Sequence, residues 1–203
     1  TTNRDAGLLL SAYLDSYGPL AESLGLTYPD YLKALLSKDK LGVFELGTGC
    51  GIVGITMAKR FPKAEVLVTD MLEAEEIAEH NISTLARCTS SDGSLVKLAY
   101  QNLDWEKSLP DNIHERDLDL ILVADCTYNS DVVPDLVKTL ADLVELNREA
   151  LILVAMKIRH SSEVIFFELM KQKNLIALDT LVFPLPLLGQ DAEEIELHFF
   201  KQD

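Results

Sequence analysis

Short apolar runs alternate along the chain with stretches in which apolar residues recur every three or four positions. The runs predict strands, and the recurring stretches predict amphipathic helices. The predicted strands span residues 41–46, 66–69, 95–99, 118–124, 151–155, 175–183 and 195–200. The predicted helices span about 5–17, 28–37, 51–60 and 161–173, with two more between the second and third strands and between the fourth and fifth. This alternation is typical of a parallel sheet that helices cover on both faces.

The helix after the fourth strand has a clear pattern. Ser130 and Asp131 are expected to cap its start, because their side chains can accept hydrogen bonds from free backbone N–H groups. Its apolar positions recur every three or four residues. The same pattern directs Asp135, Lys138 and Asp142 toward solvent.

The last two predicted strands have too little sequence between them for a helix. Pro184, Pro186 and Gly189 fall in this stretch and predict turns. A parallel crossover needs a longer connection, so the two strands are expected to be antiparallel. The fold class is therefore predicted as α/β, with a Rossmann-like, doubly wound sheet of seven strands that is mostly parallel and ends in an antiparallel strand.

Length and composition favour one domain. The chain has 203 residues, 48% of them hydrophobic, which suits a single core spanning 1–203 with a helical cap formed by 1–40. The apolar runs are shorter than the roughly 18 residues of a membrane-spanning helix, and the first residues lack the features of a secretory signal. Because the chain begins with Thr1 instead of Met, the sequence is compatible with a preceding segment that is missing from it.

Charge narrows the class of partner. The chain carries 33 acidic and 18 basic residues, for a net charge of −15. Such a protein repels phosphate backbones and attracts basic surfaces, so nucleic acid is a poor candidate ligand.

The three cysteines are far apart and odd in number, which favours reduced thiols and a cytoplasmic or nuclear location. No histidine or cysteine has metal-ligand spacing, and we expect no metal.

A glycine-rich turn follows the first predicted strand. It reads Glu45-Leu46-Gly47-Thr48-Gly49-Cys50-Gly51, and glycines there allow a backbone to approach a ligand closely. Asp70 ends the next strand, where a carboxylate can accept hydrogen bonds from both hydroxyls of a ribose. Together these residues indicate a nucleoside-binding site.

Two alternatives compete with that interpretation. The segment Gly49-Cys50-Gly51-Ile52-Val53-Gly54 also fits the dinucleotide-binding pattern of a nicotinamide enzyme. The turn could equally serve only as a tight strand-to-helix connection. Against a dinucleotide enzyme stand the earlier glycine at Gly47, the acid at Glu45 and the antiparallel closing strands.

Three segments together resemble the class I methyltransferases of methyltransferase family 16, a group with many protein-lysine methyltransferases. They are 45–51, Leu103-Asp104-Trp105 and the Asp-x-x-Tyr sequence from Asp125 to Tyr128. The chain departs from the group at Arg4-Asp5-Ala6, where a Trp-Glu-Ala-like segment is usual. The resemblance implies S-adenosylmethionine as cofactor and S-adenosylhomocysteine as product.

The resemblance also implies which residues hold the cofactor. The glycine turn would line its methionine and ribose parts, Asp70 its ribose, and Trp105 its adenine, with backbone from Ala124 beside it. The full set implied to bind the cofactor is Glu45, Gly47, Thr48, Gly49, Gly51, Asp70, Met71, Trp105 and Ala124. Asp104 is expected to be a solvated loop acid, and Cys126 a buried, unreactive thiol.

Asp125 and Tyr128 are the candidate catalytic residues. Asp125 follows a buried strand at the edge where open α/β sheets bind ligands, and Tyr128 offers both a ring and a hydroxyl. Our hypothesis is that Asp125 orients the substrate amine and Tyr128 shapes its channel. The alternative is that Asp125 caps a turn and Tyr128 only packs.

The expected activity is methylation of a lysine side chain in a protein, such as a translation-related protein, that presents a basic surface. The enzyme is expected to act as a monomer, away from membranes and nucleic acids. Two other functions stay open: a small-molecule N-methyltransferase, which needs a more enclosed pocket, and a non-catalytic binding module of the same fold.

Overall fold

The structure is a computed structural model, and it describes residues 5–17, 26–89, 97–157, 161–185 and 193–203. Its strands are β1 (Leu41–Leu46), β2 (Ala64–Asp70), β3 (Lys97–Asn102), β4 (Leu120–Ala124), β5 (Leu151–Met156), β6 (Leu175–Leu185) and β7 (Glu193–Gln202). Its helices are α1 (Asp5–Asp15), α3 (Asp30–Leu36), α4 (Ile52–Arg60), the 3-10 turn η1 (Leu72–Ala74), α5 (Glu75–Thr89), α6 (Asp111–His114), α7 (Val133–Leu146) and α8 (Ser161–Gln172). Within these ranges no helix is both long and apolar enough to cross a bilayer.

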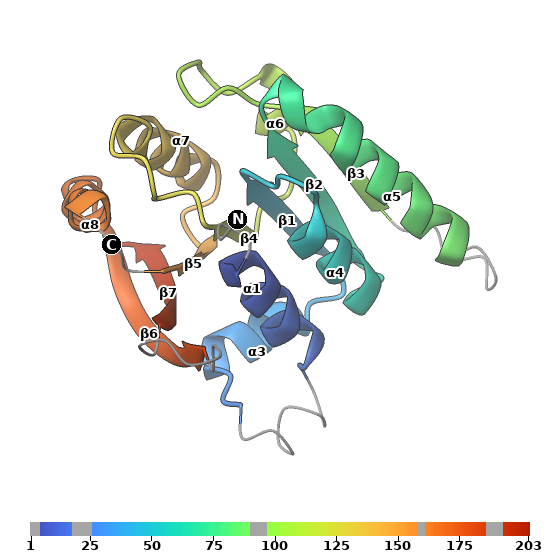
Figure 1. Cartoon of the computed structure of the whole chain (residues 1–203), viewed down its shortest axis with the longest axis horizontal. Helices are drawn as coiled ribbons and strands as arrows, with labels where there is room; N and C mark the ends of the chain where they lie inside the picture. Colours follow the sequence, from blue (N-terminus) through green and yellow to red (C-terminus); the bar gives the residue numbers. More distant parts are fainter. Residues whose placement is uncertain (1–4, 18–25, 90–96, 158–160, 186–192) are drawn as a thin grey trace.

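All seven strands belong to one sheet, in the order β3-β2-β1-β4-β5-β7-β6 (Figure 1). Neighbouring strands from β3 to β5 are parallel, whereas β7 lies antiparallel between β5 and β6. The predicted fold class and the antiparallel closing strands are confirmed. Because β2 and β4 flank β1, the order of winding changes at β1, and ligands of open α/β sheets bind at such a point, beyond the carboxyl ends of the strands.

Alternate side chains of the central strands enter two separate cores. On one face Val43 and Leu120 pack with residues of α1, α3 and α4. On the other face Phe44 and Ile121 pack with residues of α6, α7 and α8. Figure 1 shows α1 and α4 on one side of the sheet and α7 and α8 on the other. The near-continuous apolar runs of β1 and β4 follow from burial on both faces.

The start of α7 corrects one sequence prediction. The helix begins at Val133, and neither Ser130 nor Asp131 caps it, because Val132 holds the cap position without a side-chain hydrogen bond. Asn129 organises the turn instead. Its side-chain oxygen accepts a hydrogen bond from the Asp131 N–H, and its carbonyl accepts those of Val132 and Val133. Proline follows in the first turn of the helix, where its missing N–H costs nothing.

The third strand is also displaced from its predicted position. It runs from Lys97 to Asn102, whereas the apolar pattern placed it over 95–99. The start of the predicted range lies outside the described residues. The strand extends through Gln101 and Asn102 because both continue the parallel ladder with the end of β2, at Thr69 and Asp70. Its polar composition reflects its place at the edge of the sheet.

Candidate functional site

The glycine turn after β1 depends on left-handed backbone at three positions. Gly47, Gly49 and Gly51 have φ angles of 65°, 56° and 82°. Side chains are rarely tolerated there, and at Gly47 space forbids one as well. A Cβ on Gly47 would lie 2.4 Å from the Cys126 sulfur and 3.3 Å from the Trp105 ring. The turn therefore brings bare backbone against the ends of β4 and the β3–α6 connection.

Asp70 holds this turn in place from the end of β2. Its Oδ2 accepts a hydrogen bond from the Gly49 N–H at 2.7 Å, and its Oδ1 accepts one from the Met71 N–H at 2.7 Å. Each carboxylate oxygen can accept more than one hydrogen bond. The two backbone contacts thus fix the carboxylate while leaving it able to receive a ligand.

Glu45 lies beneath the turn, outside the wall of the cavity described below. Its side chain is buried and accepts a hydrogen bond from the Gly54 N–H at 2.8 Å, which joins β1 to α4. Burial raises the pKa of this carboxyl to about 8, and the charge of Asp70 acts in the same direction, while Thr48 and Gly54 oppose the shift. Glu45 is thus a structural link between strand and helix.

Glu45→Gln is expected to remove a pH dependence of stability. The folded-state pKa of about 8 lies above the ordinary value of 4.5. Ionisation therefore opposes folding, and the free energy of unfolding falls as pH rises between these two values. Glutamine cannot ionise. The melting temperature of Glu45→Gln, relative to that of the wild type, should therefore rise as pH increases across this window. Glu73→Gln, at an exposed position, provides the control. Parallel profiles of melting temperature against pH for the wild type and Glu45→Gln would contradict the raised pKa of Glu45.

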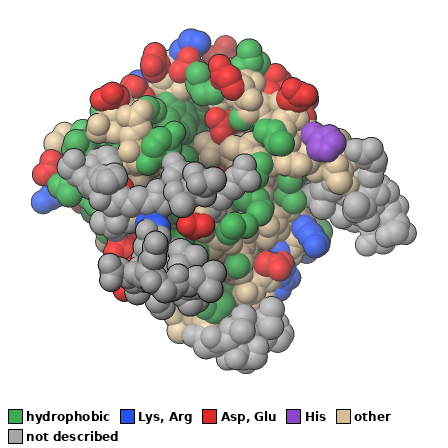
Figure 2. Space-filling model, viewed as in Figure 1, with side chains coloured by type: hydrophobic (Ala, Val, Ile, Leu, Met, Phe, Trp, Pro, Cys, Tyr) green, Lys and Arg blue, Asp and Glu red, His purple; other side chains and the backbone are tan. Residues whose placement is uncertain are grey.

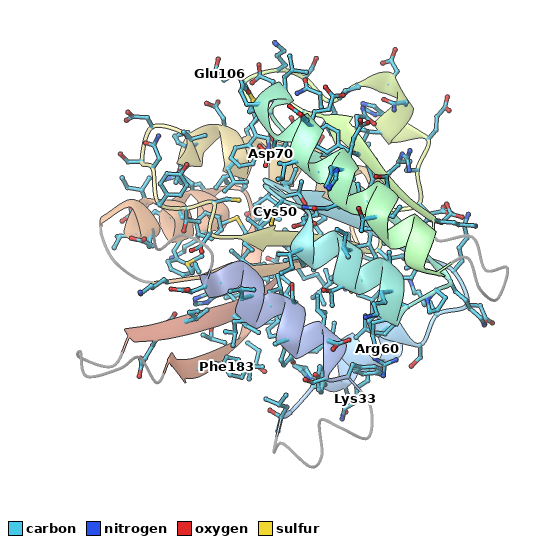
Figure 3. The ribbon with its side chains drawn as sticks, turned by 45° about the vertical axis from the view of Figure 1, so that its right-hand side comes forward. Lys33, Cys50, Arg60, Asp70, Glu106 and Phe183 are labelled. Carbon is cyan, nitrogen blue, oxygen red and sulfur yellow. The ribbon has the colours of Figure 1, made fainter. Side chains whose placement is uncertain are left out.

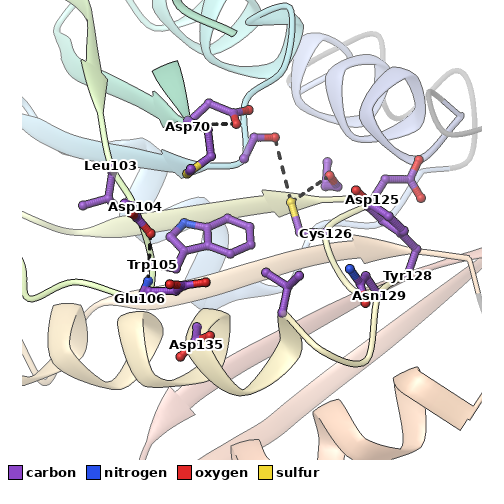
Figure 4. Close-up of a pocket in the computed structure, with 14 residues that line it drawn as sticks. Asp70, Leu103, Asp104, Trp105, Glu106, Asp125, Cys126, Tyr128, Asn129 and Asp135 are labelled. Carbon is purple, nitrogen blue, oxygen red and sulfur yellow. Dashed lines mark hydrogen bonds between the residues drawn. The ribbon is translucent and has the colours of Figure 1, made fainter. Parts of the chain in front are cut away.

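A cavity of about 510 Å³ opens at the carboxyl ends of β1, β2 and β4 (Figure 4). Its size falls within the roughly 300–1,000 Å³ of small-molecule sites. Seven residues singled out from the sequence line it: Gly47, Asp70, Met71, Trp105, Ala124, Asp125 and Tyr128. Thr48, Gly49 and Gly51 support the turn without entering the wall, and Gly49 faces open space.

The two candidate catalytic residues lie on the loop after β4. Asp125 has a backbone φ of 55°, which is unusual for a residue other than glycine. Its N–H donates a hydrogen bond to the Ala155 carbonyl of β5. Its Oδ2 accepts a hydrogen bond from the Ala6 N–H of α1 at 3.3 Å. Tyr128 is 60% exposed and lies at the mouth of the cavity. Strained backbone of this kind concentrates at functional sites.

Several wall residues were missed in the sequence. Asp104, expected to be solvated, lines the cavity, and its hydrogen bond with Lys107 lowers the pKa of the carboxyl. Asp135, expected to face solvent, also lines it, because the first turn of α7 lies beside the cavity. The thiol of Cys126 forms part of the wall, and burial raises its pKa, which keeps it unreactive. The other missed wall residues are Leu103, Glu106, Asn129 and Val132.

Every charged side chain in the wall is acidic. These are Asp70, Asp104, Glu106, Asp125 and Asp135. Figure 2 shows acidic side chains gathered along the upper rim of one face, and Figure 3 places Asp70 and Glu106 away from Lys33 and Arg60. Three lysines just before β1 and β2 form ion pairs with acids: Lys38 with Asp119, Lys40 with Asp117 and Lys63 with Asp39. The cavity therefore favours cations. In the described part of the chain, no group of three potential ligands is arranged to hold a metal ion.

Comparison with known proteins identifies related sequences. A family model described as lysine methyltransferase matches residues 4–173. The chain is 31% identical over 173 residues to the protein N-lysine methyltransferase METTL21A of Xenopus tropicalis. The alignment covers 85% of this chain and 67% of that protein. It is 32% identical over 136 residues to the protein-lysine N-methyltransferase EFM3 of Saccharomyces cerevisiae, which covers 64% of this chain and 38% of that protein. The chain thus spans only part of each relative.

A solved structure supports the fold. A TehB-like SAM-dependent methyltransferase from Corynebacterium glutamicum matches with a TM-score of 0.58 and 14% identity, covering 97% of this chain and 100% of that one. At such low identity the likeness concerns the arrangement of strands and helices.

Proposed function

This chain belongs to the lysine methyltransferase family, and we therefore propose that it transfers a methyl group from S-adenosylmethionine to a lysine side chain of a protein. The observation that carries the proposal is the meeting of two groups of residues in one cavity. Gly47 and Asp70 enter it from the nucleoside-binding side, and Asp125 and Tyr128 enter it from the loop after β4.

The residues present fit the cofactor. Asp70 supplies fixed acceptors for ribose hydroxyls, and Trp105 offers an aromatic face beside its buried Nε1, which has no hydrogen-bond partner among the described residues. The acidic wall suits a cation, and the cofactor carries a positively charged sulfonium. When bound, that sulfonium supplies an electrophilic methyl group.

The protein's own contribution is positioning. A displacement at the methyl carbon requires the amine to be neutral, stripped of water and aimed in line. Asp125 accepts hydrogen bonds from the lysine nitrogen and sets its direction, while Tyr128 forms one wall of the approach. Because Tyr128 is 60% exposed, the mouth suits an extended side chain presented by a protein better than an enclosed small molecule.

The partner is proposed to be a protein with a basic surface around its target lysine, since the wall and the net charge are both negative. The same charge disfavours nucleic acid. We further propose that the protein acts as a monomer in the cytoplasm or the nucleus; its odd number of widely spaced cysteines is in keeping with this location.

Asp70→Ala is expected to weaken binding of S-adenosylhomocysteine by about tenfold to a hundredfold, the effect of losing hydrogen bonds to a charged acceptor. Isothermal titration calorimetry measures this change. Glu73→Ala is the matched control, because it removes an exposed acid from the same edge of the sheet without touching the cavity wall. Equal losses in both variants would mean that Asp70 acts only through general charge.

Calorimetry also tests the proposed function as a whole. Binding of S-adenosylhomocysteine to the wild-type protein is expected. A full-length protein that binds neither the cofactor nor its product would exclude both the protein and the small-molecule methyltransferase, and would leave the non-catalytic binding module.

A further inference from the structure

We propose that helix α1 is a positioning element of the active site, with the Ala6 amide holding the Asp125 carboxylate at the cavity wall. The contact joins two residues that are 119 positions apart in the sequence. Ala6 N–H donates to Asp125 Oδ2 at 3.3 Å. The proposal rests on the proposed function only for its catalytic consequence, since the contact itself is independent of any ligand.

The amide is well placed for this role. It belongs to the first turn of α1, where backbone N–H groups have no acceptor within the helix. The positive end of the helix therefore faces the carboxylate, and a negative charge there stabilises the helix. Ala6 is completely buried, so water does not compete readily for its N–H.

Packing holds the start of α1 against the loop. A Cβ on Gly7 would lie 3.9 Å from the Ala124 side chain, 3.8 Å from Ile52 and 4.0 Å from Val53. The helix thus rests on the end of β4, where Ala124 lines the cavity, and on the start of α4. The start of α1 therefore packs against Ala124, the residue that precedes Asp125.

Asp125 is consequently fixed by two different elements. Its backbone N–H bonds β5, through the Ala155 carbonyl, and its carboxylate bonds α1. The left-handed φ of 55° turns the residue out of the strand direction, and the bond to Ala6 N–H then restricts the side chain. Docking of α1 and orientation of the carboxylate toward a substrate amine are therefore linked, and each stabilises the other.

Hydrogen exchange of α1 tests the contact without any ligand. Asp125→Asn keeps an acceptor oxygen and tolerates the left-handed backbone, whereas Asp125→Gly keeps the backbone conformation and removes the acceptor. The α1 amides are expected to exchange about tenfold faster in Asp125→Gly than in the wild type, and at nearly the wild-type rate in Asp125→Asn. Amides of β4 and β5 should be unchanged in both variants.

Two results would overturn the proposal. One is wild-type exchange of α1 in Asp125→Gly. The other is equally faster exchange in α1 and in the core strands, which indicates general destabilisation. Failure of the proposed function is distinguishable, because it would appear as an absence of methyl transfer to protein by the wild type, whatever the exchange of α1.

The catalytic consequence is tested from the side of the helix. Ala6→Pro removes the donating N–H at a position where proline suits helical backbone. It is expected to lower kcat about tenfold while the affinity for S-adenosylhomocysteine stays unchanged. Ala12→Gly, at an exposed position of α1, weakens the helix by propensity alone and keeps the contact, so it should retain kcat. An equal fall in kcat for both variants, or wild-type kcat in a folded Ala6→Pro, would contradict a positioning role; if Ala6→Pro does not fold, the exchange measurements decide.

Discussion

Asp125→Ala is expected to reduce methyl transfer at least about a hundredfold while binding of S-adenosylhomocysteine stays near the wild-type level. Removal of one well-placed polar group that stabilises a transition state commonly has an effect of this size. Asp125 lines the cavity from the loop after β4, apart from the glycine turn and Asp70, so the cofactor contacts should survive. Single-turnover transfer and calorimetry on the same preparation measure the two quantities.

Asp125→Asn separates the charge from the geometry. Asparagine keeps the size of the side chain, the acceptor for Ala6 and the tolerance for a φ of 55°. If the negative charge orients the lysine amine, this variant should be nearly as slow as Asp125→Ala. Transfer at the wild-type rate by Asp125→Ala would remove this residue from the mechanism.

Gly47→Ala is expected to destabilise the protein by about 2–5 kcal/mol, from left-handed strain and overpacking together. The new Cβ would lie 2.4 Å from the Cys126 sulfur, at a φ of 65°. The variant should also lose cofactor affinity, because Gly47, Cys126 and Trp105 share the cavity wall. Urea denaturation and calorimetry measure these effects.

Gly49→Ala is the matched control for strain. Its φ of 56° is nearly the same, but a Cβ there meets nothing within 4 Å. It should cost only about 1–2 kcal/mol of stability. Removing the sulfur as well, in Gly47→Ala with Cys126→Ala, should recover part of the loss. Equal stability of the two glycine variants would show that close packing at Gly47 is unimportant.

The sheet and the glycine turn were predictable because their signals are local. Strands buried on both faces read as continuous apolar runs, and left-handed turns select glycine. The closing strands were predictable because Pro184 and its neighbours leave no room for a helix. The meeting of Gly47 and Asp70 in one cavity followed, since parallel strands end at the same edge of a sheet.

Other parts of the site depend on long-range packing. Asp135 follows a helical pattern that predicts exposure, and only the placement of α7 beside the cavity makes it a wall residue. The contact between Ala6 and Asp125 leaves no mark in the local sequence, because a backbone amide is the donor. Arg4, which stands where the family usually has a Trp-Glu-Ala-like segment, lies outside the described residues. Ala6, two positions later, donates its backbone N–H to the Asp125 carboxylate.

We propose that this chain methylates a lysine of a protein. This activity is tested most directly by incubating the wild-type protein and Asp125→Ala with S-adenosylmethionine and a cell lysate, followed by mass spectrometry of the lysate proteins. The wild type is expected to add one or more methyl groups to a lysine side chain in a basic sequence, and the variant is not. Methylated small molecules with no modified lysine, or no transfer by a protein that binds the cofactor, would contradict it.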